Sequence, residues 1–166
     1  SCAKPQRGFR NHLTKRINEA KKLGLENVLV IVSCSTDPFQ PIERKQKDSL
    51  FALESLLSGG FPVLVMTRNP QMLLGGEYQR IINNPKLYVD VSIPSTQENN
   101  PNSIFYSAIV PPLAETFETI RKLSDLGKQV RVKVEPIIPS INGLVGQSQK
   151  ELNEIVKRSK ESGVGK

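Results

Sequence analysis

The chain has 166 residues, of which 37% are hydrophobic and 5% aromatic, and its 23 basic and 16 acidic side chains give a formal net charge of +7. This length corresponds to one domain that can bury a hydrophobic core. The longest unbroken apolar run, residues 28–32, is far shorter than the roughly 18 residues of a membrane-spanning helix, so we expect no membrane association. Two cysteines cannot form a disulfide framework and no signal-peptide pattern is visible, so we expect a reducing compartment, the cytoplasm.

Helical and strand patterns alternate along the chain. Apolar residues spaced three or four apart predict helices, and β-branched runs bounded by glycine, proline or asparagine predict strands. In chain order we predict a helix over 13–23, a strand over 27–33, a helix over 50–57, a strand over 62–67, a helix over 72–82, a strand over 87–93, a helix over 112–126, a strand over 130–134 and a helix over 148–162.

This alternation predicts the α/β class, because strands joined through helices lie parallel and connect by right-handed crossovers. Four strands could form an open doubly wound sheet or an arc of a barrel. A complete eight-stranded barrel typically needs about 250 residues. We therefore expect residues 1–166 to be a single domain, and an incomplete one if the strands belong to a barrel.

Polar residues follow every predicted strand, and in both architectures ligands bind beyond the carboxyl ends of the strands. These polar clusters are residues 33–37, 67–69, 92–96 and Glu135. We expect them to line one rim of the sheet. The alternative is that they form ordinary turns and helix caps, for which Ser, Thr and Asp are also favoured.

The most informative string is Ser-Thr-Asp-Pro-Phe-Gln-Pro-Ile-Glu over residues 35–43. Its two prolines predict a stiff loop, and Asp37, Gln40 and Glu43 offer hydrogen-bond acceptors. The string resembles a segment of the radical S-adenosylmethionine proteins described as DNA repair photolyases, relatives of spore photoproduct lyase. Weaker similarities follow in order at residues 67–69, 91–93, 120–127 and 136–139, so the resemblance spans roughly residues 10–162.

This resemblance implies a parallel sheet that is part of a TIM-like barrel. It also implies S-adenosylmethionine and a four-iron, four-sulfur (4Fe-4S) cluster as cofactors, and a 5′-deoxyadenosyl radical that abstracts hydrogen from a substrate such as a nucleic-acid lesion. By the same resemblance, Arg68 would bind the methionyl carboxylate and Ser92 would hydrogen-bond the cofactor. The residues that would shape the cofactor pocket are Ser35, Thr36, Asp37 and Glu43.

The two cysteines need separate interpretations. Cys34 lies where spore photoproduct lyase has a cysteine that returns a hydrogen atom to the substrate, and the alternative is a thiol that packs in the core. The CxxxCxxC motif that binds the cluster in this family is absent, and Cys2 and Cys34 cannot replace it. We therefore expect the chain to be part of a longer protein that supplies the cluster ligands, and to contain no metal site of its own.

Two other classes of function remain open. An iron-free α/β enzyme could act on a phosphorylated small molecule, with Gly143 and Gly146 directing backbone N–H groups at the phosphate. A basic module could instead bind nucleic acid through residues 1–24, which carry seven basic side chains and one acidic side chain.

Overall fold

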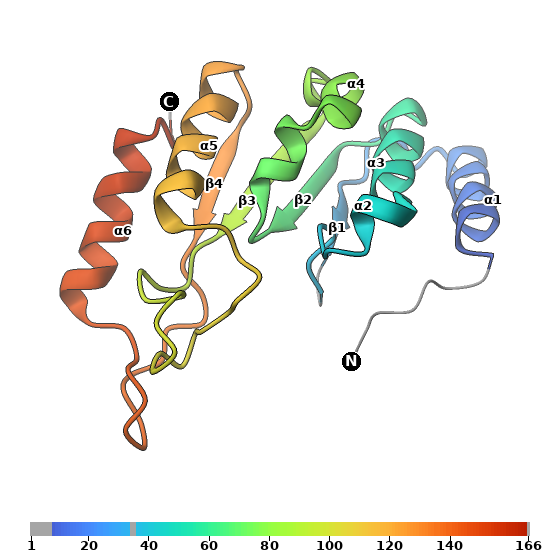
Figure 1. Ribbon diagram of the computed structural model, residues 1–166. Helices are drawn as coiled ribbons and strands as arrows, with labels where there is room; N and C mark the ends of the chain where they lie inside the picture. Colours follow the sequence, from blue (N-terminus) through green and yellow to red (C-terminus); the bar gives the residue numbers. More distant parts are fainter. Residues whose placement is uncertain (1–7, 34–35, 166) are drawn as a thin grey trace.

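A computed structural model describes residues 8–33 and 36–165, in which helices and strands alternate (Figure 1). Within these residues, no helix combines the length and the apolar content needed to cross a membrane. The elements are α1 (Phe9–Lys22), β1 (Val30–Val32), α2 (Glu43–Gln46), α3 (Asp48–Ser58), β2 (Val63–Thr67), η1 (Pro70–Leu74), η2 (Gly76–Tyr78), α4 (Gln79–Ile82), β3 (Leu87–Ser92), α5 (Leu113–Asp125), β4 (Val130–Lys133) and α6 (Gln149–Glu161).

The four strands form one parallel sheet in the sequential order β1-β2-β3-β4. Val65 in the centre of β2 pairs with Val32 of β1 on one side and with Val89 of β3 on the other. The α/β class and the parallel pairing are therefore confirmed. Because all the pairs are parallel, the carboxyl ends of the four strands lie along one edge, where the polar clusters were expected to meet.

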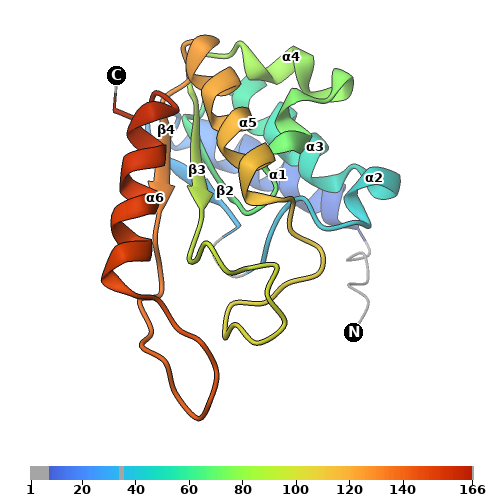
Figure 2. The ribbon, with the colours of Figure 1, turned by 60° about the vertical axis from the view of Figure 1, so that its left-hand side comes forward.

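One face of this sheet carries the hydrophobic core. Side chains alternate between the two faces of a strand, and the core takes Val63 and Val65 from β2 with Val89 and Val91 from β3. The core also includes buried residues of α1, α3, α5 and α6, namely Ile17, Leu53, Ile120 and Ile155. Figures 1 and 2 show α3, α4 and α5 on this face of the sheet.

The opposite face has no helix among those of the described residues packed on it. Its strand residues form three rows across the sheet: Ile31, Leu64 and Tyr88; Met66, Asp90 and Arg131; and Ser92 and Lys133. Asp90 is only 1% exposed and binds Arg131 through two hydrogen bonds of 2.7 and 3.0 Å. This helix-free face is thus apolar near the amino ends of the strands and polar near their carboxyl ends.

The predicted helix over 72–82 is wrong, because the segment divides at Gly75 into η1, η2 and α4. Gly75 has an extended backbone with φ −65° and ψ 147°. Each glycine of the Gly75-Gly76 pair disfavours a helix by about 1 kcal/mol relative to alanine. The short pieces still bury Leu73, Tyr78 and Ile82 in the core. Strand β1 is also shorter than the predicted residues 27–33.

Two long loops leave the carboxyl ends of β3 and β4 and lie against each other below the sheet (Figure 1). The backbone of Ile104 donates to Val145, and that of Val145 donates to Asn102. Glu151, at the start of α6, accepts from Ser95 Oγ at 2.5 Å and from the backbone N of Thr96. These contacts attach the loop that follows β3 to α6 and to the loop that follows β4; this is the side of the loop away from β2.

Replacing Gly146 by alanine tests the packing of the second loop. A Cβ there would lie 2.4 Å from the carbonyl oxygen of Ile138, so we expect the free energy of unfolding to fall by about 1–3 kcal/mol. Gly76→Ala is the matched control, because its Cβ would meet nothing within 4 Å. Urea denaturation of both variants gives the comparison, and equal stabilities would contradict this packing.

Candidate functional site

The carboxylate of Asp37 joins the carboxyl ends of β1 and β2. It accepts hydrogen bonds from Thr67 Oγ1 at 3.0 and 3.1 Å, from the backbone N of Arg68 at 2.6 Å and from the backbone N of Phe39 at 2.8 Å. Thr67 Oγ1 in turn accepts from the backbone N of Asn69 at 2.8 Å. The polar clusters after the first two strands therefore meet at one place, as their positions predicted.

Glu43, the first residue of α2, is an internal acceptor for the first turn of α3. It is 4% exposed and accepts from the backbone N of Ser49 and of Leu50, each at 2.9 Å, and from the hydroxyl of Tyr78 at 3.1 Å. A carboxylate at this place satisfies N–H groups that the first turn of the helix leaves free. Burial, and then the charge of Glu43, raise the pKa of Tyr78 far above its ordinary value, so the hydroxyl remains a donor.

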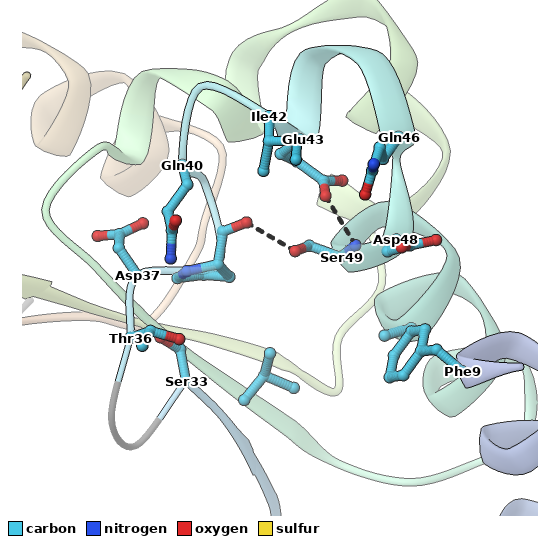
Figure 3. Close-up of a pocket in the computed structure, with 13 residues that line it drawn as sticks. Phe9, Ser33, Thr36, Asp37, Gln40, Ile42, Glu43, Gln46, Asp48 and Ser49 are labelled. Carbon is cyan, nitrogen blue, oxygen red and sulfur yellow. Dashed lines mark hydrogen bonds between the residues drawn. The ribbon is translucent and has the colours of Figure 1, made fainter. Parts of the chain in front are cut away.

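A first cavity, of about 360 Å³, lies beyond the carboxyl end of β1 (Figure 3). Thr36, Asp37 and Glu43 line it together with residues of α1 and α3. Figure 3 shows Gln40 above Asp37 and the Glu43 carboxylate directed at Ser49. Three of the predicted pocket residues therefore surround one cavity, although both carboxylates already accept several bonds from the chain itself.

A second cavity, of about 310 Å³, adjoins Asp37 and lies between the 37–44 segment and the loop after β3. Arg68 and Arg44 give it two positive charges, Asp37 gives it one negative charge, and Asn69 and Ser107 give it neutral polar groups. Asp37 lines both cavities. Because guanidinium groups bind carboxylates and phosphates well, this second cavity suits an anionic group.

Arg68 is paired with Glu98, a residue of the loop after β3 that the sequence did not indicate. Arg68 Nη2 lies 3.0 Å from Glu98 Oε1, and it also donates to the carbonyl of Phe105 at 3.5 Å. The Glu98 side chain is 12% exposed, and burial raises its pKa although Arg68 acts in the opposite direction. Arg68 Nε is buried and has no hydrogen-bond partner among residues 8–33 and 36–165.

The predicted site residues therefore divide into three groups. Thr36, Asp37, Glu43 and Arg68 lie around the two adjoining cavities. Ser92 ends β3 on the helix-free face, opposite Lys133 of β4, and lines neither cavity. Cys34 and Ser35 lie outside the described residues, so their predicted roles stay predictions.

The residues of the two alternative functions have local partners. The backbone N of Gly146 donates to Ser140 Oγ at 3.0 Å, so this N–H already has an acceptor within its own loop. On the basic helix α1, Arg10 pairs with Asp48 and Arg16 pairs with Glu19.

Within residues 8–33 and 36–165, no group of three or more His, Cys, Asp or Glu side chains is placed to hold a metal ion. Comparisons with protein-family models, with curated protein sequences and with solved structures found no match to this chain. The geometry of the rim and the sequence resemblance are therefore the observations from which a function is argued.

Replacing Glu43 by glutamine tests the internal role of its carboxylate. We expect the free energy of unfolding to fall by about 1–3 kcal/mol, because three buried donors lose a charged acceptor. Glu77→Gln is the matched control, since Glu77 forms an exposed ion pair with Lys47, for which at most about 1 kcal/mol is expected. Urea denaturation should separate the two variants, and an equal loss would contradict the internal role.

The Glu98 carboxyl should titrate above the ordinary value of 4.5, and the exposed Glu118 carboxyl, beside Arg121, should titrate below it. NMR of side-chain carboxyl carbons measures both groups in one sample. Since its pKa is higher in the folded chain, Glu98 favours folding below about pH 4.5, and this contribution is lost as the pH rises through the raised pKa.

Arg68→Met should raise the Glu98 pKa further, and a fall in that pKa would contradict the ion pair.

Proposed function

We propose that this chain forms part of the barrel of a radical S-adenosylmethionine enzyme, with the rim beyond β1 and β2 binding the cofactor. The observation that carries the proposal is the sheet itself. Four parallel strands follow one another in sequential order with the core helices on one face, as consecutive units do in a TIM-like barrel. The resemblance of residues 35–43 then specifies the family among many that share this fold.

The helix-free face supports a barrel more than a doubly wound sheet. A doubly wound sheet has helices on both faces, whereas the interior of a barrel is filled by side chains from the strands alone. Leu64 and Asp90 are 5% and 1% exposed although no helix of the described chain covers them. In the proposed barrel these side chains face the interior.

The second cavity supports a place for the methionyl carboxylate of S-adenosylmethionine. Arg68 lines this cavity and could bind a carboxylate through two parallel hydrogen bonds. Asp37 holds the backbone of Arg68, so its role in the proposal is to position that arginine. Glu43 would fix the floor of the first cavity rather than contact the cofactor, because its oxygens accept three internal bonds.

The iron–sulfur cluster of this family does not fit the chain as it stands. Such clusters are held by cysteine thiolates, and the sequence contains only Cys2 and Cys34, both outside the described residues. In this proposal the cluster ligands belong to a part of the enzyme outside these 166 residues. An electron from that cluster would cleave S-adenosylmethionine to methionine and a 5′-deoxyadenosyl radical. The chain's own residues would bind and orient S-adenosylmethionine for a substrate such as a DNA lesion, as the resemblance implies.

Calorimetric titration of the 166-residue chain with S-adenosylmethionine tests the proposal. We expect Arg68→Met to weaken binding by about 1.5–3 kcal/mol, the value of a hydrogen bond to a charged group. Arg80→Met is the matched control, because Arg80 is exposed and pairs with Glu54 away from both cavities. An unchanged affinity in Arg68→Met would remove the cofactor assignment, and no binding by the unmodified chain would refute the proposed function.

A further inference from the structure

The loop after β3, residues 94–112, forms one wall of the second cavity. Ser107, Ile109 and Val110 line the cavity from this loop, opposite Gln40 and Arg44. The far side of the loop is fixed by Glu151 and by the backbone bonds with Val145. On the β2 side the loop is held through Arg68, which contacts both Glu98 and the carbonyl of Phe105.

The attachment of the loop through Arg68 leaves buried polar atoms without hydrogen bonds. Within the part of the chain that the structure describes, buried Arg68 Nε has no acceptor, and Glu98 Oε1 makes no hydrogen bond of good geometry although Nη2 lies 3.0 Å away. Buried polar groups are normally satisfied, and an unsatisfied one costs free energy. Burial also raises the pKa of Glu98 despite the adjacent guanidinium, so the pair gains little from being held together.

An external anion could satisfy Arg68 better than Glu98 does. A carboxylate or phosphate can accept from Nε and one Nη of the same guanidinium in parallel. Here Nη2 is already occupied by Glu98 and Nε is buried. A ligand that binds Nη2 and Nε together would therefore take the place of Glu98 at Nη2. Arg44 on the opposite wall adds a second positive charge that favours an external anion.

We propose that Glu98 is an internal competitor for Arg68, and that a ligand's carboxylate or phosphate group displaces it and thereby releases the 94–112 loop from β2. The inference deepens the proposed function, because the methionyl carboxylate is one such group, but the exchange itself needs only an anion. By thermodynamic linkage, the free energy by which a bound anion weakens the Glu98–Arg68 contact equals the free energy by which that contact weakens anion binding.

Glu98→Gln removes the competing charge and keeps the shape of the side chain. We expect this variant to bind S-adenosylmethionine and inorganic phosphate about tenfold more tightly than the unmodified chain. Binding of 5′-methylthioadenosine, which lacks the carboxylate, should not change. Glu77→Gln is the matched control, since Glu77 is exposed and lines neither cavity.

Amide hydrogen exchange provides a second measurement that needs no variant. In the unmodified chain, saturating S-adenosylmethionine or phosphate should speed exchange at the backbone N of Ser107, which donates to the carbonyl of Glu98. In Glu98→Gln this exchange should already be fast, and either anion should change it little. The amide of Thr96, held by Glu151, should stay slow throughout.

The outcomes separate this inference from the proposed function. Tighter phosphate binding by Glu98→Gln with no binding of S-adenosylmethionine would support the exchange and refute the cofactor. Cofactor binding that depends on Arg68 but is unaffected or weakened in Glu98→Gln would overturn the exchange and leave the proposed function standing. If neither anion binds, or if both slow the exchange of Ser107, the inference is wrong.

Discussion

The rim of this sheet depends on one carboxylate, that of Asp37. The carboxyl ends of two parallel strands leave backbone N–H groups and a threonine hydroxyl without partners, and a carboxylate has acceptor sites enough for all of them. By accepting from Phe39, Thr67 and Arg68, Asp37 ties the loop after β1 to the end of β2. The same bonds fix the backbone of Arg68 and the wall shared by the two cavities.

The sequence predicted the features that depend on local periodicity. Leu87, Val89 and Val91 alternate with polar residues, and all three are buried on one face of β3. The segment over 72–82 was predicted less well, because its apolar spacing suits a helix while Gly75 and Gly76 oppose one. Leu73, Tyr78 and Ile82 are nevertheless buried there, and the glycines divide the backbone into short pieces.

The site residues show why acidic side chains in a sequence cannot be assigned to a ligand or to the chain itself. Asp37 and Glu43 lie beside prolines and polar residues, a context that suits either use. Which use a carboxylate has depends on the groups that donate hydrogen bonds to it. One donor to Glu43 is the hydroxyl of Tyr78, which lies 35 residues further along the chain. Glu98 has no such sequence context to draw attention to it. It lies in a polar loop of a kind typical of solvent-exposed residues, and only the fold brings it to Arg68.

The helix-free face bears most directly on whether the sheet belongs to a barrel. A carboxylate as buried as that of Asp90 is normally paired, and here Arg131 supplies two hydrogen bonds while its own side chain remains 66% exposed. An arginine that solvates freely gains less from such a pair than one that is enclosed, because water screens the attraction. Further strands closing over this face, as in the barrel that we propose, would strengthen the pair and bury Ile31, which is 46% exposed. The polar pair and the exposed Ile31 therefore both support the barrel interior that we propose.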